Sequence, residues 1–287
     1  MVDSLLNAVQ NKQVHHAYLF QGPRGVGKTT TARLLAKSLN CEKPKKGEPC
    51  GTCEVCVAFQ DRSFLDVVEI DAASNRGIDD VRALRESALS SPGQGAYKIY
   101  IIDEVHMLTK EAFAASLKTL EEPSSHAVFI LATTELHKVP DTIISRCQLF
   151  RFRRATEQEM HSRLSDIVKA EKASVHEDIL QFIVGRSDGC YRDAESLLGQ
   201  FLSLPKKAKS LDEMMEHMGM PAPQLIEEFI TCLEQNNTDG ALSQAQAAYD
   251  RGYDPDLFIE ESIRFARDLA VKRAVKSESP ANLPQII

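Results

Sequence analysis

The stretch Gly22-Pro-Arg-Gly-Val-Gly-Lys-Thr29 fits the pattern G-x-x-x-x-G-K-[ST] of phosphate-binding loops, and such a loop indicates an α/β fold. An apolar run at 17–20 predicts a strand before it, and apolar residues at helical spacing over 30–39 predict a helix after it. Glycines let backbone N–H groups surround phosphates, and the N-terminus of the following helix adds its dipole. A chance glycine-rich turn is the alternative, but the flanking strand and helix favour a nucleotide site.

Two side chains of this loop have chemistry that a bound triphosphate needs. Lys28 can reach the β- and γ-phosphates, and the Thr29 hydroxyl can ligate Mg²⁺. The candidate nucleotide-binding residues of the loop are Gly22, Arg24, Gly25, Val26, Gly27, Lys28, Thr29 and Thr30.

Two adjacent acids follow a second apolar run. Ile99 to Ile102 predicts a buried strand that ends in Asp103 and Glu104. Open α/β sheets bind ligands at the carboxyl ends of their strands. We therefore expect Asp103 to hold Mg²⁺ and Glu104 to orient or deprotonate an attacking water. Taken alone, the pair could be a solvated strand end, but a phosphate loop on another strand favours hydrolysis.

Four of the seven cysteines, Cys41, Cys50, Cys53 and Cys56, lie within sixteen residues at the spacing C-x8-C-x2-C-x2-C. Four thiolates suit tetrahedral Zn²⁺ with no open position, which is a structural site. An iron–sulfur cluster is the main rival and a redox dithiol is a weaker one. The sequence favours zinc.

Composition and charge limit the location and the partners of the chain. Its 287 residues predict two or three domains, and 43% hydrophobic with 26% charged residues is ordinary for a globular protein. No apolar run could span a membrane and the N-terminus does not resemble a secretory signal, so we expect a cytoplasmic protein without a disulfide framework. The net charge of −7 means that any contact with DNA requires a local basic patch or an assembly.

The pattern of the chain predicts an α/β domain over 1–154, with the cysteine insert at 41–56 inside it. Capping and helical spacing predict a three-helix unit over 155–205, and a short basic linker over 205–210 follows. Further helical patterns over 211–276 predict a modest helical bundle, and the proline-containing tail over 277–287 is expected to be disordered. The predicted strands of the parallel sheet are 17–20, 67–70, 98–102, 128–132 and 148–152.

The order of these motifs resembles the AAA+ clamp-loader subunits gamma/tau of bacterial DNA polymerase III over about residues 5 to 205. The resemblance depends on the phosphate loop, the four-cysteine insert, Glu69 to Asp80, Ile101 to His106, Leu117 to Pro123, Leu131 to Thr134, and Ser145-Arg146-Cys147. It implies an AAA+ P-loop ATPase domain, a three-helix lid and a partial helical collar.

The resemblance also implies roles for single residues. Thr134, or alternatively Thr133, resembles the first sensor, a polar side chain that faces the γ-phosphate. Arg192 resembles the second sensor, which couples the lid to the bound nucleotide. Arg146 resembles the arginine finger that acts on ATP in a neighbouring subunit. Judged from the residues alone, Arg146 and Arg192 could each be an ordinary surface arginine.

The activity implied by the resemblance is hydrolysis of ATP with Mg²⁺ in a hetero-oligomeric ring of clamp-loader subunits. This ring would load a sliding clamp onto primer–template DNA as a part of the DNA-directed DNA polymerase holoenzyme. Two alternatives stay open: a non-hydrolysing structural subunit of the same ring, and a zinc-dependent DNA-binding module. Family members usually begin with a segment that contacts adenine, and the sequence starts where that segment would end. Either a truncated sequence or weakened base recognition would explain this.

Overall fold

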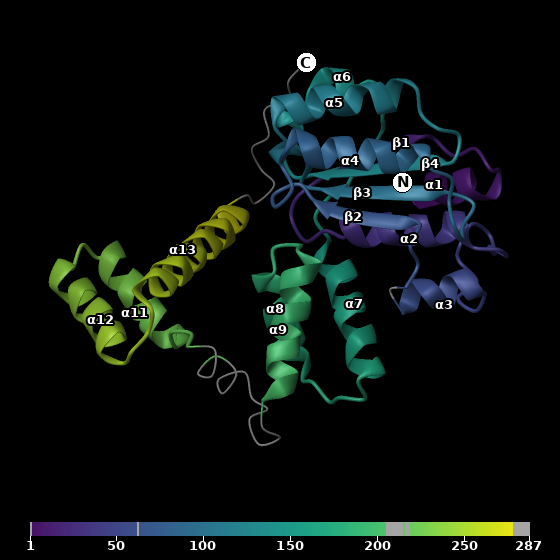
Figure 1. Ribbon diagram of the computed structural model, residues 1–287. Helices are drawn as coiled ribbons and strands as arrows, with labels where there is room; N and C mark the ends of the chain where they lie inside the picture. The colour runs from purple at the N-terminus through teal and green to yellow at the C-terminus, as the bar shows by residue number, and fades with distance from the viewer. Residues whose placement is uncertain (1, 62, 205–214, 216–218, 278–287) are drawn as a thin grey trace, which may run out of the picture. The chain divides into compact units, whose positions relative to one another are not determined.

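The computed structural model describes residues 2–61, 63–204, 215 and 219–277, and it divides into two compact units. The first unit comprises 1–163 with 184–196, and the second comprises 164–183 with 197–287 (Figure 1). The predicted linker at 205–210, nearly all of the first part of the predicted bundle (211–218), and the tail from 278 lie outside the described residues. The domain boundaries expected from the sequence stay predictions.

The first unit contains a five-stranded sheet in the order β2-β3-β4-β1-β5, with every neighbouring pair parallel. All five predicted strands are present, so the predicted parallel sheet is confirmed. The order places β4 between β1 and β3, and the carboxyl ends of all strands share one edge. The strands are β1 (Ala17–Gln21), β2 (Val67–Asp71), β3 (Lys98–Asp103), β4 (Ala127–Thr133) and β5 (Gln148–Arg151).

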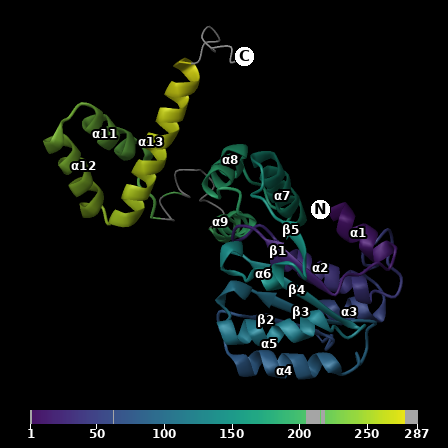
Figure 2. The same cartoon turned by 90° about the horizontal axis from the view of Figure 1, so that it is seen from above.

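Both faces of this sheet are covered by helices, which explains why the central strands are apolar except at their ends. Helices α1 and α2 cover one face, and α4 and α5 cover the other (Figures 1 and 2). Tyr18 and Phe20 pack in the core of the first face, whereas Leu19 and Tyr100 pack in the core of the second. The helices and short helical turns of this part are α1 (Val2–Gln10), α2 (Lys28–Asn40), α3 (Glu54–Gln60), α4 (Ile78–Leu89), η1 (Val105–Met107), α5 (Lys110–Glu121), η2 (Leu136–Lys138) and α6 (Asp141–Ile144).

The three helices predicted after the sheet are α7 (Glu157–Ala170), α8 (Glu177–Arg186) and α9 (Tyr191–Ser203). The predicted capping box of α7 is present: Thr156 N donates to Glu159 Oε2 at 2.9 Å, and Glu159 N donates to Thr156 Oγ1 at 3.3 Å. Arg153 also pairs with Glu159 at 2.8 Å. Together these contacts fix the point where the chain leaves the sheet and becomes helical.

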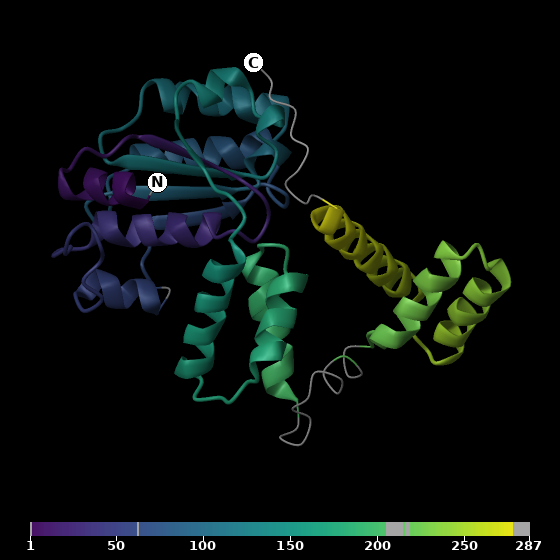
Figure 3. The ribbon, with the colours of Figure 1, turned by 180° about the vertical axis from the view of Figure 1, so that it is seen from behind.

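The second unit also contains α11 (Pro223–Glu234), α12 (Thr238–Asp250) and α13 (Pro255–Ser277) (Figure 3). Pro223 occupies the first position of α11, where a backbone N–H has no partner within the helix, so the missing N–H of proline costs no hydrogen bond. Leu225, Ile226, Ile230, Ala248 and Phe258 form a small buried cluster of these helices, as a modest bundle requires. Among the residues that the structure describes, no helix has the length and apolarity needed to cross a membrane.

Candidate functional site

The phosphate loop connects β1 to α2 and has two positions where a side chain would not fit. A Cβ on Gly22 would clash with the backbone of Phe152, and a Cβ on Gly25 would clash with Cys190 Sγ. Gly25 also has φ of +71°, which other residues rarely adopt. Arg192 N contacts Gly25 O at 3.4 Å, so the start of α9 lies against this loop.

Lys28, the first residue of α2, is buried with an exposed fraction of 5%. Its Nζ donates to Gly22 O at 2.8 Å and to Pro23 O at 2.7 Å, which holds the ammonium inside its own loop. Burial lowers the pKa of Lys28, the charges of Glu104 and Asp103 raise it, and the charge of Arg192 lowers it further. Two cations this close together favour an anionic ligand between them.

Thr29 and Asp103 meet across the carboxyl edge of the sheet. Thr29 Oγ1 donates to Asp103 Oδ2 at 2.7 Å, although the residues are 74 positions apart. The second oxygen, Asp103 Oδ1, accepts from Glu104 N at 2.9 Å. A hydroxyl and a carboxylate oxygen at this separation fit two ligand positions of one Mg²⁺, which binds few protein oxygens and keeps several waters.

Glu104 follows β3 in a left-handed conformation, with φ of 47° and ψ of 46°. This strained backbone directs its carboxylate toward the end of β4, where Thr134 Oγ1 donates to Glu104 Oε2 at 2.9 Å. Thr133 is fully buried, and its hydroxyl contacts His106 Nδ1 at 3.0 Å instead. Of the two threonines considered for the first sensor, Thr134 is therefore the one beside Glu104.

Arg146 follows α6 and is held by partners outside the phosphate loop. Its Nη2 pairs with Glu121 Oε1 at 2.7 Å, and its Nη1 donates to Thr142 O at 2.6 Å. The side chain keeps an exposed fraction of 34%. The guanidinium is thus oriented within its own subunit while part of it faces solvent.

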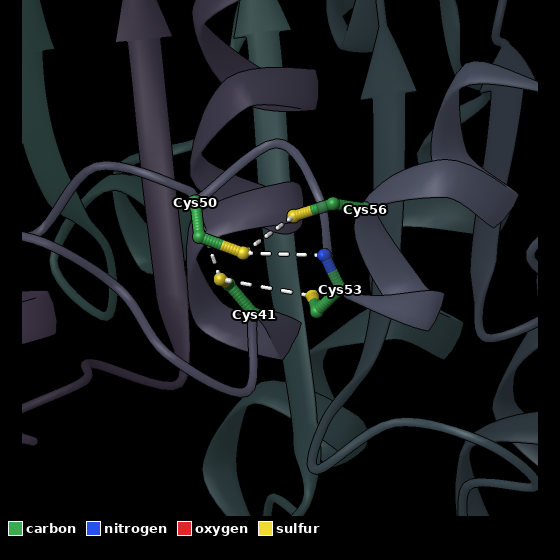
Figure 4. Close-up of side chains that lie close together, drawn as sticks. All are labelled: Cys41, Cys50, Cys53 and Cys56. Atoms are coloured by element: carbon green, nitrogen blue, oxygen red, sulfur yellow. Dashed lines mark hydrogen bonds between the residues drawn. The ribbon is translucent and has the colours of Figure 1, made fainter.

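The four clustered cysteines form a compact sulfur site (Figure 4). Their Sγ atoms all lie within 4.8 Å of one another, and the Cys41–Cys53 and Cys50–Cys56 pairs are each separated by 4.0 Å. A tetrahedral ion with Zn–S bonds of about 2.3 Å requires S–S separations of about 3.8 Å. The thiolates of an iron–sulfur cluster bind different iron atoms and would lie farther apart. The geometry therefore fits a single zinc ion.

Backbone N–H groups prepare this sulfur site for a cation. Cys50 N donates to Cys41 Sγ at 3.2 Å, and Cys53 N donates to Cys50 Sγ at 3.3 Å. The N–H groups of Thr52 and Cys53 lower the pKa of Cys50 to about 6, whereas burial raises the pKa of Cys56 to about 12. A zinc ligand must be a thiolate, so binding of the ion would release the Cys56 proton.

Comparisons with solved structures agree with this architecture. The Thermotoga maritima RuvB Holliday junction branch migration motor superposes with a TM-score of 0.55 at 17% identity, covering 90% of this chain and 84% of that chain. Domain III of the Thermotoga maritima replication initiation protein DnaA gives 0.52 at 16% identity, covering 74% and 87%. The fold and the phosphate loop define a P-loop domain with the AAA+ fold.

Sequence comparisons narrow the class to a family. A family model described as DNA polymerase III, delta subunit, matches residues 1–156. The DNA polymerase III subunit tau of Bacillus subtilis is 45% identical over 93% of this chain and 47% of its own length. The subunit tau of Escherichia coli is 35% identical over 94% of this chain and 42% of its own length. The chain belongs to the DNA polymerase III tau/gamma subunit family, and it spans less than half the length of these two relatives.

Two groups of site residues were not predicted from the sequence. Glu121 lies in a quoted motif, but its contact with Arg146 depends on how α5 and α6 pack. His106 follows Glu104 by two residues and contacts it, and it also contacts Glu135 because β3 and β4 are neighbours. The spacing of apolar residues along a helix or a strand cannot predict such contacts between separate elements.

Proposed function

We propose that this chain binds and hydrolyses ATP as a motor subunit of the bacterial DNA polymerase III clamp loader. The observation that carries the proposal is the 2.7 Å hydrogen bond between Thr29 Oγ1 and Asp103 Oδ2. It brings the phosphate loop to the strand end where Glu104 contacts Thr134. Loop, metal ligands and general base therefore occur at one edge of one sheet.

Each side chain at this edge has a role in phosphoryl transfer to water. The backbone N–H groups of the loop bind the phosphate oxygens, and Lys28 leaves its two carbonyl partners to bind the β- and γ-phosphates. Thr29 and Asp103 would hold Mg²⁺, which when bound supplies positive charge to the phosphate oxygens. Glu104 orients a water for in-line attack and accepts its proton, while Thr134 holds that carboxylate.

Two arginines complete the proposed reaction site. Arg192 contacts the loop at Gly25, so its position can respond to the phosphates bound there. Arg146 is held in its own subunit by Glu121 and would reach the ATP of a neighbouring subunit. A guanidinium that neutralises γ-phosphate charge in the transition state contributes ~10³-fold or more in rate.

Zinc bound by Cys41, Cys50, Cys53 and Cys56 would have a structural role, because four thiolates leave no position for a substrate. It would fix the insert between α2 and α3, the helices that these cysteines adjoin. A purely structural zinc ion distinguishes the chain from a module that binds DNA through its zinc site.

The remaining partners are proposed from the tau/gamma family of the chain. They are other clamp-loader subunits in a hetero-oligomeric ring, a sliding clamp and primer–template DNA, all in the cytoplasm. The net charge of −7 supports DNA contact through a local basic surface within such an assembly. Binding of ATP would order the ring to open the clamp, and hydrolysis stimulated by DNA would release it.

Reconstitution tests this function. The chain is combined with the other loader subunits, the sliding clamp and primer–template DNA, and ATP-dependent clamp loading and ATP turnover are measured. We expect both activities, and we expect Lys28→Ala to abolish nucleotide binding at this subunit and to reduce both. Lys37→Ala, on the same helix, is the matched control. Normal loading and turnover with Lys28→Ala would show that the chain only fills a structural place in the ring.

A further inference from the structure

A buried histidine lies between two glutamates at the carboxyl edge of the sheet. His106 is in η1, directly after β3, and its side chain has an exposed fraction of 5%. Its Nδ1 lies 3.4 Å from Glu104 Oε2 and 3.0 Å from Thr133 Oγ1. Its Nε2 lies 3.3 Å from Glu135 Oε1. One imidazole ring thus contacts groups that follow two different strands.

The acceptors around the ring restrict its orientation. Both carboxylates can only accept, so a ring that holds Glu104 and Glu135 together carries an N–H on each of its two nitrogens. A hydrogen bond from Lys138 lowers the pKa of Glu135 and so keeps that carboxylate ionised. Thr133 Oγ1 also accepts from Glu135 N at 3.0 Å, which ties this segment to the end of β4. The ring therefore has one edge toward Glu135 and the other toward Thr133 and Glu104.

Glu104 needs such support because its own backbone is strained and its side chain is long. The residue has φ of 47°, and the hydroxyl and N–H of Thr134 contact Glu104 Oε2 at 2.9 and 3.3 Å. A general base must be held within hydrogen-bond reach of the attacking water, and a displacement of 1 Å costs about 10²-fold in rate. His106 contacts the same oxygen from a second direction.

We infer that His106 is a positioning residue for Glu104, since its ring links the Glu104 carboxylate to Thr133 and Glu135. This inference rests on the proposed hydrolysis of ATP at Glu104. His106 lies behind the carboxylate rather than at the phosphates, so it sets the rate of the chemical step and leaves nucleotide binding unchanged.

Steady-state kinetics of the reconstituted loader test the inference. We expect His106→Ala to lower kcat by about 10- to 100-fold with little change in the KM for ATP. His106→Asn should recover part of kcat, because its amide can replace Nδ1, whereas His106→Gln should recover less. His126→Ala, which removes a half-buried ring that contacts Ser90 O, is the control. An unchanged kcat in His106→Ala, or equal losses in kcat and affinity for all three variants, would overturn the inference.

Nitrogen NMR of the imidazole rings gives a readout that does not depend on turnover. We expect Glu104→Gln and Glu135→Gln each to shift the resonances of the His106 ring, while the His126 ring stays unchanged. If His106 responds to neither variant, the inference is wrong whatever the turnover. A second outcome separates this inference from the proposed function. If the wild-type complex hydrolyses no ATP at this subunit, but both variants shift the His106 resonances, the proposed function is wrong while the contacts of His106 with the two glutamates are supported.

Discussion

Thr29 Oγ1 donates a 2.7 Å hydrogen bond to Asp103 Oδ2, which joins the start of α2 to the end of β3. Sheet order explains this contact, because β1 and β3 lie on either side of β4 with their carboxyl ends at the same edge. The pair gives the phosphate loop a carboxylate that the loop itself lacks.

Asp103→Asn should weaken the dependence of nucleotide binding on Mg²⁺. The amide keeps the shape of the side chain but loses the charge that a hard cation prefers. We expect at least about a tenfold rise in the Mg²⁺ concentration that half-saturates ATP binding, equivalent to roughly 1.4 kcal/mol. Titration of Mg²⁺ at fixed fluorescent ATP analogue measures this. Asp79→Asn, an exposed acid in the first turn of α4, is the control, and an unchanged midpoint for Asp103→Asn would contradict the role.

Arg146→Ala should reduce the DNA-stimulated ATP turnover of the assembled loader by ~10³-fold at the site it completes. ATP binding by the altered subunit itself should persist, because Arg146 is paired with Glu121 and Thr142 outside the phosphate loop. Arg163→Ala, which removes another arginine from an ion pair, is the matched control. Loss of ATP binding in the Arg146→Ala subunit would place the arginine in its own site instead.

Glu121→Ala should affect turnover in the same direction as Arg146→Ala but less strongly. The carboxylate orients the guanidinium without touching the neighbouring nucleotide, so the arginine keeps its charge when Glu121 is lost. We expect about a tenfold loss of turnover, with Glu122→Ala as the control beside it in the sequence. Full turnover with Glu121→Ala would show that the ion pair does not orient the finger.

Removal of zinc should destabilise the first unit. The four cysteine sulfur atoms bring the insert together, so loss of the ion leaves them close to one another without a bridging cation. We expect bound zinc in the purified chain and a lower Tm after chelation or in Cys56→Ser. Cys147→Ser, which changes a half-buried thiol outside the insert, should leave zinc binding unchanged. Absence of zinc, or a Tm that chelation does not change, would contradict the structural site.

We expect the free energy of unfolding to depend on pH through the carboxyl group of Asp66. Burial raises the pKa of this carboxyl, but N–H donors from Gly93, Gln94 and Gly95 at 2.6–2.8 Å outweigh it, so the pKa is lowered overall. Because the pKa of Asp66 is lower in the folded state, the carboxylate contributes fully to the free energy of unfolding above the unfolded-state pKa of about 3.9. This contribution disappears as the pH falls through the folded-state pKa. Asp66→Asn should lose ~1–3 kcal/mol of unfolding free energy near neutral pH, as measured by urea denaturation. Asp61→Asn is the control, and an equal loss at every pH would contradict the account.

Local patterns in the sequence are sufficient to predict much of the fold and part of the candidate site. The phosphate loop, the apolar strands and the C-x2-C-x2-C spacing are encoded over a few neighbouring residues. Asp103 and Glu104 could be predicted because carboxyl ends of parallel strands share an edge. The edge of the sheet at which these two residues lie can therefore be predicted without knowing the order of the strands.

Contacts between separate elements could not be predicted in the same way. The cradle of Asp66 consists of N–H groups 27 to 29 residues away, and the His106 contact with Glu135 requires β3 and β4 to be neighbours. Backbone N–H donors have no sequence signature, and strand order is a property of the whole sheet. The choice between Thr133 and Thr134 also required the structure, because only the pleat decides which hydroxyl is buried.

The most direct measurement is ATP turnover by the reconstituted loader with Glu104→Gln in this chain, beside equilibrium binding of ATP to the same variant. The amide keeps the shape of the side chain and its contact position near Thr134, but it cannot accept a proton from water. We expect that ATP still binds and that turnover at this subunit falls by ~10²-fold or more. Turnover equal to that of the unaltered chain would contradict it.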